Sequence, residues 1–231
     1  MNTTSITTTT TTTSLICNST CESQSWLSSA NLLAEWQFDN NVIETISNTN
    51  TPSDQSPVYT TGYINQGLLC DANANQSLIS SPVPIANMSF TIDAWIYPTG
   101  FPNPDDHSIV GVCPTPSTYE CLHITIHKNN GGNYILYFGF YGDDCLGSTY
   151  IIANEWIHVA FVFDTSSLIQ SIYLNGVLDA TRTAQGIFKG SPNIVTIGNI
   201  PLISGPNYFQ VKLNKFFFFY FIHLMILIGN Y

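Results

Sequence analysis

The fold of this chain is decided by the ten-residue stretch EWIHVAFVFD, residues 155–164. Aromatic and β-branched residues fill this stretch, and such residues favour a β-strand. Further along, the segment YLNGVL (173–178) places Asn-Gly between two apolar pairs, which indicates a tight hairpin because both turn residues accept positive φ. The two segments together predict antiparallel strands.

Similar β-rich runs continue on both sides of this pair, separated by clusters of turn residues. The segment NNGGN (129–133) predicts another tight turn between two of these runs, because glycine readily adopts positive φ. No stretch of helical periodicity longer than about three turns interrupts them, so the sequence predicts an all-β sandwich or barrel. The remaining predicted strands are LLAEWQF (32–38), FTIDAWIY (90–97), HSIVGVC (107–113), LHITIHK (122–128), NYILYFGF (133–140), QSIYLNG (170–176) and NIVTIG (193–198).

Five motifs in this series resemble strands of laminin-G-like domains, which belong to the concanavalin A-like lectin/glucanase jelly rolls. The resemblance covers about residues 31–210 and implies an all-β, two-sheet antiparallel jelly-roll sandwich. The motifs, in chain order, are LAEWQFD (33–39), FTIDAWIYP (90–98), WIHVAFVFD (156–164), YLNGV (173–177) and IVTIGN (194–199).

The end of the chain departs from that family. Its members continue after a late phenylalanine with a strand of the type F-x-G-x-I-D-x-V-x-I-Y. Here Phe209-Gln210 is followed by the apolar tail VKLNKFFFFYFIHLMILIGNY (211–231). We therefore expect the closing strand to be missing, which would expose a sheet edge, or to be replaced by the tail.

Three interpretations of the tail follow. Residues 216–228 could anchor the chain in a membrane, although a span needs about 20 apolar residues. The tail could be translated non-coding sequence, since its residues have A/T-rich codons. It could also occupy the vacant position as a surrogate strand.

Composition excludes several classes of protein. Only 9% of the 231 residues are charged, and 5 Lys+Arg against 15 Asp+Glu give a net charge of −10. So few basic residues exclude a nucleic-acid partner, whereas 13% aromatic residues can form a sizeable core. Residues 1–30 form a Thr/Ser-rich segment that is predicted to be a disordered stalk. Three parts result: the stalk, a domain at 31–210 and the tail at 211–231.

The six cysteines predict disulfides. Cys113 and Cys121 flank a loop between two predicted antiparallel strands, where a bridge across the hairpin base is geometrically natural. Cys17 and Cys21 enclose a short loop in the stalk. By elimination Cys70 then pairs with Cys145, although some of the six could instead be buried free thiols.

Four N-x-Ser/Thr sequons also occur, at Asn2, Asn18, Asn75 and Asn87. Together with the even number of cysteines, they favour the secretory pathway. We therefore expect an extracellular or cell-surface glycoprotein.

A candidate ligand-binding face follows from the strand FTIDAWIY (90–97). Alternation places its apolar residues towards the core and Thr91, Asp93, Trp95 and Tyr97 on the opposite face. Aromatic rings stack on sugars and carboxylates accept hydrogen bonds from hydroxyls, so this face suits a glycan. Alternatively, Trp95 packs under a loop and Asp93 bonds to a neighbouring strand.

Two acidic loops are candidates for calcium, which prefers several oxygen ligands. Asp143-Asp144 is preferred over Asp105-Asp106, and both pairs are also compatible with ordinary turns. His123 and His127 would lie roughly 13 Å apart on a strand, too far to share a metal ion. No cofactor is required, and calcium is the only one that the sequence suggests.

The sequence contains none of the motifs by which hydrolases of these known types are recognised. The five Glu are scattered singly, so the paired carboxylates of glucanases are absent, as are a nucleophile elbow and an H-E-x-x-H motif. His158 could act as a base only with a partner carboxylate, and the sequence identifies none.

We therefore predict a non-catalytic extracellular recognition module that binds a glycan or an extracellular protein. Two alternatives stay open, a structural spacer in a larger adhesion protein and a divergent glycoside hydrolase. A membrane partner is expected only if the tail is a real anchor.

Overall fold

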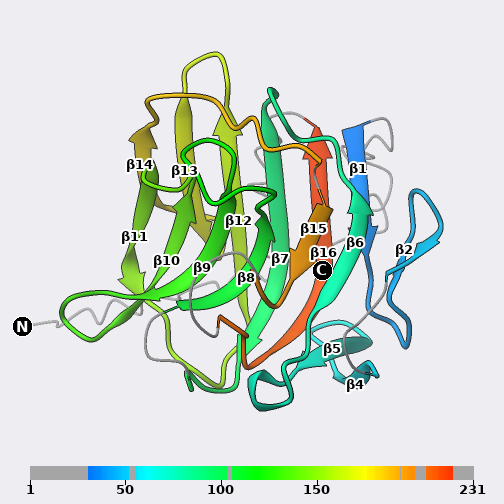
Figure 1. Ribbon diagram of the computed structural model, residues 1–231. Coiled ribbons are helices and arrows are strands. Elements are labelled where there is room, and N and C mark those ends of the chain that lie inside the picture. The colour runs from blue at the N-terminus through cyan, green and yellow to red at the C-terminus, as the bar shows by residue number, and fades with distance from the viewer. Residues whose placement is uncertain (1–30, 52–55, 103–105, 193, 201–206, 221–231) are drawn as a thin grey trace, which may run out of the picture.

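The computed structural model describes residues 31–51, 56–102, 106–192, 194–200 and 207–220. They form two antiparallel sheets packed face to face (Figure 1), which confirms the predicted two-sheet sandwich. The predicted stalk, with Cys17, Cys21 and the sequons at Asn2 and Asn18, lies outside the described residues.

The larger sheet contains ten strands, and the hairpin predicted at Asn175-Gly176 joins two of them. The order is β14 (Val177–Thr183), β13 (Ile169–Leu174), β12 (Ile157–Asp164), β7 (Phe90–Pro98), β16 (Val211–Tyr220), β1 (Leu32–Trp36), β2 (Ile43–Glu44) and β3 (Thr49–Asn50). Off this path, β5 (Gln66–Cys70) pairs with β16 and with β4 (Val58–Thr61).

The smaller sheet contains six strands, and the predicted NNGGN turn joins two of them. The order is β11 (Asp144–Tyr150), β10 (Tyr134–Gly139), β9 (Leu122–Lys128), β8 (Asp106–Val112), β15 (Ile194–Ile197) and β6 (Leu78–Pro82). A 3₁₀ turn, η3 (Ala72–Ala74), lies between β5 and β6.

The core lies between the two sheets and is rich in phenylalanine. Phe90 on β7 packs against four other phenylalanine rings, with centroids 5.9–6.5 Å from its own. They are Phe138, Phe140, Phe163 and Phe188. Edge-to-face and tilted contacts of this kind stabilise a core beyond the area that they bury.

The closing strand is present, and the apolar tail supplies it. Val211–Tyr220 forms β16, which pairs with β7 on one side and with β1 on the other. Figure 1 shows the red β16 beside the blue β1. The domain boundary expected at residue 210 therefore lies immediately before a central strand, and the exposed edge predicted for a missing strand does not form.

An alternating pattern explains why residues 211–220 form a strand. Four of them are fully buried in the core, and a β-bulge at Lys215, with φ 51°, shifts the alternation by one residue. With the pattern F-x-G-x-I-D-x-V-x-I-Y beginning at Phe209, Leu213, Phe216 and Phe218 fall on its I, V and I positions and Val211 falls on its G. The four residues in the core cluster are Val211, Leu213, Phe216 and Phe218, and Asn214 and Phe219 are buried outside that cluster.

This placement bears on the predicted membrane anchor at 216–228. Its first residues, Phe216 to Tyr220, belong to β16, and the rest lies outside the described residues. Within the described part of the chain, no helix is long and apolar enough to span a bilayer.

The structure contains the predicted Cys113–Cys121 disulfide, but Cys70 and Cys145 are free and buried. The expected Cys70–Cys145 bridge was wrong because β5 and β11 belong to different sheets, with β11 at the far edge of its own. Burial raises the pKa of the Cys70 thiol to about 12 and that of Cys145 to about 11. Both thiols are therefore protonated and unreactive in the folded protein.

The sequon residues Asn75 and Asn87 are both exposed. Asn75 ends the η3 turn, and Asn87 lies just before β7. Their exposure is compatible with glycosylation, which stays a prediction.

Substitutions in β16 test whether the tail is part of the core. Phe216→Ala should lower the free energy of unfolding by about 3–5 kcal/mol, because it leaves a cavity in the core. The neighbouring Phe217→Ala, on the outer and partly exposed face, should cost much less. Urea denaturation measures both values, and equal losses would contradict the assignment of β16 to the core.

Alkylation tests the cysteine assignment. Unfolding without a reductant should expose Cys70 and Cys145 to iodoacetamide, whereas Cys113 and Cys121 should react only after reduction. Peptide mass mapping reads out each site. Labelling of Cys113 before reduction, or protection of Cys70 after unfolding, would contradict the assignment.

Candidate functional site

The predicted ligand face of β7 does not present its polar groups to solvent. Thr91 is 1% exposed and Asp93 is 4% exposed. Asp93 Oδ1 lies 2.9 Å from Nε2 of His158 on the adjacent strand β12. The prediction that Asp93 contacts a ligand is therefore corrected: Asp93 binds His158 on the neighbouring strand instead.

The Asp93 carboxylate is also the partner of His158 that could not be identified from the sequence. Both side chains are buried, at 4% and 5% exposure, so a substrate cannot reach the pair. The pair links β7 to β12 and does not resemble an accessible acid–base site.

The two aromatic residues of the predicted face join a larger aromatic group. Tyr63, in the loop between β4 and β5, stacks on Trp95 with ring centroids 3.6 Å apart. Trp156 contacts the Tyr63 and Tyr97 rings, at 6.2 and 5.4 Å. Lys212 lies over the Tyr97 ring, with its Nζ 4.7 Å from the centroid. We call Tyr63, Trp95, Tyr97 and Trp156 the Tyr63 cluster.

The turn that carries Tyr63 is held by Asn214 of β16. The Asn214 side-chain oxygen accepts a hydrogen bond from Ile64 N–H at 3.0 Å, and its amide donates to the Gln66 carbonyl at 2.6 Å. Gly62 packs so closely that a Cβ there would lie 2.7 Å from the Gln66 oxygen. Tyr63 thus covers Trp95, which confirms that Trp95 packs under a loop.

The candidate calcium ligands Asp143 and Asp144 point in different directions. Asp143 is buried, lies 2.9 Å from the Arg182 guanidinium and accepts a hydrogen bond from Gln185 N–H at 2.6 Å. Asp144 accepts from Gly142 N–H at 3.1 Å. A guanidinium beside Asp143 disfavours a second cation, so these carboxylates do not fit a calcium site.

The other acidic loop does not gather metal ligands either. Asp106 Oδ1 lies 2.7 Å from His127 Nδ1, and Asp105 lies outside the described residues. Among the described residues, no group of three or more His, Cys, Asp and Glu could hold a metal ion.

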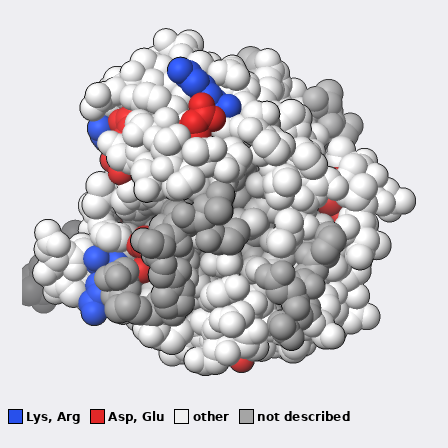
Figure 2. All heavy atoms as spheres, in the orientation of Figure 1, with Lys and Arg blue, Asp and Glu red and all other residues white. Residues whose placement is uncertain are grey.

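A different surface, missed at the level of the sequence, lies on the outer face of the smaller sheet. An open hollow of about 430 Å³ is lined by Thr118, His123, Tyr137, Tyr141 and Gly142. We call it the His123 hollow. Figure 2 shows that the surface seen from the direction of Figure 1 is mostly uncharged, with charged residues in a few separate places.

Two strands provide the floor of the hollow. His123 on β9 stacks on Tyr137 of β10, with centroids 4.9 Å apart and an interplanar angle of 20°. Gly139 lies beneath them, because a Cβ there would be 2.4 Å from Tyr137 Cε1, 2.6 Å from Asp144 Oδ1 and 2.7 Å from His123 Nε2. The absent side chain at Gly139 thus allows these three groups to converge.

Two loops form the walls of the hollow. Thr118 belongs to the loop closed by the Cys113–Cys121 disulfide, and Tyr141 follows β10 with φ 59°. The loops are tied together by a hydrogen bond from Tyr119 N–H to the Phe140 carbonyl at 2.8 Å. The disulfide therefore helps to fix the shape of the hollow.

Burial controls the charge state of the hollow. It lowers the pKa of His123, although the carboxylates of Asp144 and Asp106 and the Cys121 carbonyl oppose that shift. Burial, together with Asp144, raises the pKa of Tyr137. At neutral pH the hollow therefore presents an uncharged imidazole and an un-ionised phenol.

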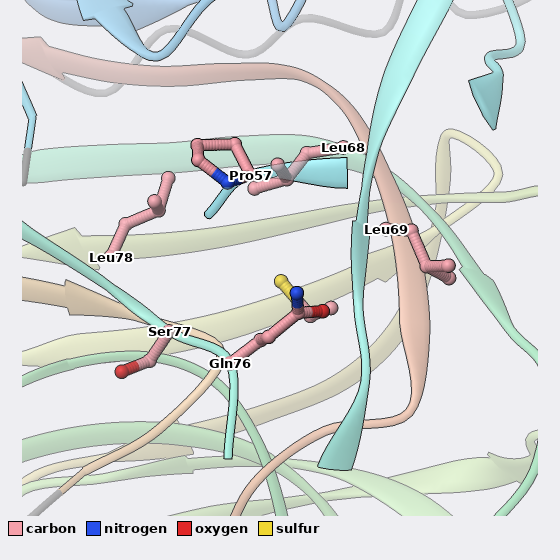
Figure 3. A pocket seen from close by; sticks show the side chains of 7 residues that line it. Pro57, Leu68, Leu69, Gln76, Ser77 and Leu78 are labelled. Atoms are coloured by element: carbon pink, nitrogen blue, oxygen red, sulfur yellow. The ribbon is translucent and has the colours of Figure 1, made fainter. Parts of the chain in front are cut away.

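A second pocket lies between β5 and the start of β6, lined by Pro57, Leu68, Leu69, Cys70, Gln76, Ser77 and Leu78 (Figure 3). Its volume is about 10 Å³, roughly the space of one water molecule. It is too small for an organic ligand.

The two packed antiparallel sheets define a β-sandwich of jelly-roll type. The sequence profile of the concanavalin A-like lectin/glucanases superfamily matches residues 71–220. The chain therefore belongs to that superfamily, as the motifs indicated. The match includes β16 and supports its place in the domain. A comparison with curated proteins finds no significant match.

Solved structures with this fold include domain 4 of AbnA, an extracellular arabinanase from Geobacillus stearothermophilus, in complex with arabinotriose. The TM-score is 0.67 at 16% identity, over 82% of this chain and 92% of that one. The binding domain of Paraclostridial Mosquitocidal Protein 1 gives a TM-score of 0.62 at 17% identity, over 85% of this chain and 51% of that one.

A third similar structure comes from botulinum neurotoxin type C, whose cell entry depends on two ganglioside molecules. It gives a TM-score of 0.63 at 14% identity, over 86% of this chain and 50% of that one. This chain thus spans about half of each toxin structure. These likenesses show the shared fold.

The lowered pKa of His123 makes stability depend on pH. The folded pKa lies below the ordinary value of 6.5, so the unfolded chain binds more protons at mildly acidic pH. Stability should fall as pH drops below about 6.5. The Asp144 and Asp106 carboxylates oppose the lowering of the His123 pKa and limit the size of the effect, whereas His127 adds to it. Tyr137 stacks on the His123 ring.

Urea denaturation from about pH 7.5 to about pH 5 measures this dependence. The loss of free energy of unfolding should be smaller in His123→Gln than in the unsubstituted protein. Identical pH profiles for the two proteins would contradict this interpretation.

Proposed function

We propose that this protein is a non-catalytic carbohydrate-recognition module that binds glycans in the His123 hollow. The observation that carries this proposal is the hollow itself, open and lined by two tyrosines, a neutral histidine and a threonine. Ligand sites have volumes of roughly 300–1,000 Å³ and combine aromatic side chains with a few placed polar groups. The His123 hollow has both properties.

The lining suits a sugar ring chemically. The faces of Tyr137 and Tyr141 offer apolar area against ring carbons, and their hydroxyls keep a polar end. Thr118 and Tyr137 can donate or accept hydrogen bonds, and Asp144 beside them accepts from sugar hydroxyls. Such paired polar contacts make a site selective, because an unmade hydrogen bond in it is costly.

The same residues disfavour hydrolysis. Cleavage of a glycosidic bond uses two carboxyl groups on either side of the scissile bond. None of the residues that line the hollow is Asp or Glu, and the two nearby carboxylates are already engaged, Asp106 with His127 and Asp144 with the Gly142 N–H. A binding role therefore fits this arrangement better than a glycosidase.

Other observations support an extracellular role. A disulfide closes the loop that carries Thr118, and disulfides persist in oxidising compartments. Asn75 and Asn87 are exposed sequon residues. Arabinotriose in the similar arabinanase domain supports a carbohydrate as the ligand class.

Two exposed tyrosines on different sheets provide a matched test. Tyr141 in the hollow is 38% exposed and Tyr63 is 43% exposed, so neither substitution should disturb the core. Tyr141→Ala should weaken glycan binding by about tenfold, as loss of an aromatic anchor does. Tyr63→Ala should leave it unchanged.

A glycan array followed by titration calorimetry measures both variants, with the thermal transition as a check on folding. Loss of binding only in Tyr63→Ala would place the ligand on the Tyr63 cluster, at the end of the originally predicted face. An unsubstituted protein that binds no glycan would contradict carbohydrate recognition and favour a spacer or a protein-binding module.

A further inference from the structure

The His123 hollow lies in a negative environment. Asp144 Oδ1 converges with His123 Nε2 and Tyr137 Cε1 above Gly139, where an added Cβ would lie within 2.7 Å of all three atoms. The Asp144 and Asp106 carboxylates both act electrostatically on His123 and Tyr137. No Lys or Arg lines the hollow. A ligand in it therefore lies near the Asp144 carboxylate and near Asp106, which is paired with His127 at 2.7 Å, and meets no Lys or Arg of the lining.

The one guanidinium near the hollow is already neutralised. Arg182 affects Tyr137, but it lies 2.9 Å from the buried Asp143 carboxylate and donates to the Asp144 carbonyl at 2.6 Å. Drawing it towards a ligand would leave Asp143 buried without its partner, which is strongly unfavourable.

None of the four lysines is part of the lining, although Lys189 lies beside the wall loop that carries Thr118. Lys189 lies over Tyr119, 5.9 Å from its centroid, and Lys212 lies over Tyr97 in the larger sheet. Lys215 Nζ is 3.2 Å from Asp39. The fourth, Lys128, is the last residue of β9 and is not part of the lining.

We infer that the His123 hollow selects uncharged saccharides and rejects sialylated, sulfated or uronic-acid-containing ones. This inference rests on the proposed carbohydrate recognition. An acidic sugar would place a further negative charge beside Asp144 and Asp106, and like charges brought together across an interface are costly. The specificity would thus differ from ganglioside binding, because gangliosides carry sialic acid.

A paired glycan array tests the inference on the full chain at neutral pH. Each neutral oligosaccharide, such as lactose or arabinotriose, is printed beside an acidic partner with the same core, such as 3′-sialyllactose. Neutral members should bind, and their acidic partners should bind at least about tenfold more weakly.

Two charge variants assign the selectivity to the hollow. Asp144→Asn keeps an oxygen for the Gly142 N–H and removes one negative charge. It should therefore narrow the difference in affinity between the neutral and the acidic oligosaccharides. Glu155→Gln makes the same change of net charge in the exposed loop before β12 and should leave the difference intact. Added salt should narrow it in the unsubstituted protein, because ions screen exposed charges.

The outcomes separate the two proposals. The inference is supported if neutral oligosaccharides bind and the ratio of neutral to acidic affinity falls in Asp144→Asn but not in Glu155→Gln. Equal or tighter binding of acidic members overturns it while carbohydrate recognition stands. The same narrowing in both variants would make the effect one of net charge and overturn its assignment to the hollow. No binding to any member overturns the proposed function itself.

Discussion

The sandwich depends on the seating of β16 between β7 and β1. This strand lies late in the sequence, yet it hydrogen-bonds to three strands from the first half of the chain, β1, β5 and β7. Its side chains Phe216 and Phe218 pack edge-on against Trp36, with centroids 6.3 and 6.1 Å away. Without β16, β7 and β1 would each lose a partner, and unpaired strands are costly inside a sheet.

The same strand organises the outer surface of the larger sheet, whereas the smaller sheet carries the candidate site. Asn214 reaches from β16 to the turn that holds Tyr63, so the aromatic cluster on that surface is a consequence of the closing strand. On the smaller sheet, β9 and β10 carry His123 and Tyr137 on the outer face, which does not pack in the core. Recognition can therefore vary on one sheet while the other secures the fold.

Alternation and turn chemistry were enough to predict the sandwich and most strands, because each local signal agrees with the global fold. β16 was harder to recognise, since consecutive phenylalanines conceal the alternation and Lys215 adds a bulge. The hollow could have been partly predicted: the NNGGN turn sets the register that pairs Gly139 with His123 and Tyr137 with Thr125. Its walls depend on the disulfide loop and on long-range contacts, which local patterns do not encode.

The position of each carboxylate gives it a different physical role. Asp93 and Asp143 are buried and paired with His158 and Arg182, so they stabilise the sandwich and offer nothing to a ligand. Asp144 follows Asp143 directly, yet the strand alternation turns it to the outer face beside Tyr137. A pair of adjacent aspartates thus divides between the interior and the surface. This division explains why an acidic loop that suggests calcium in the sequence contributes instead one salt bridge and one surface charge.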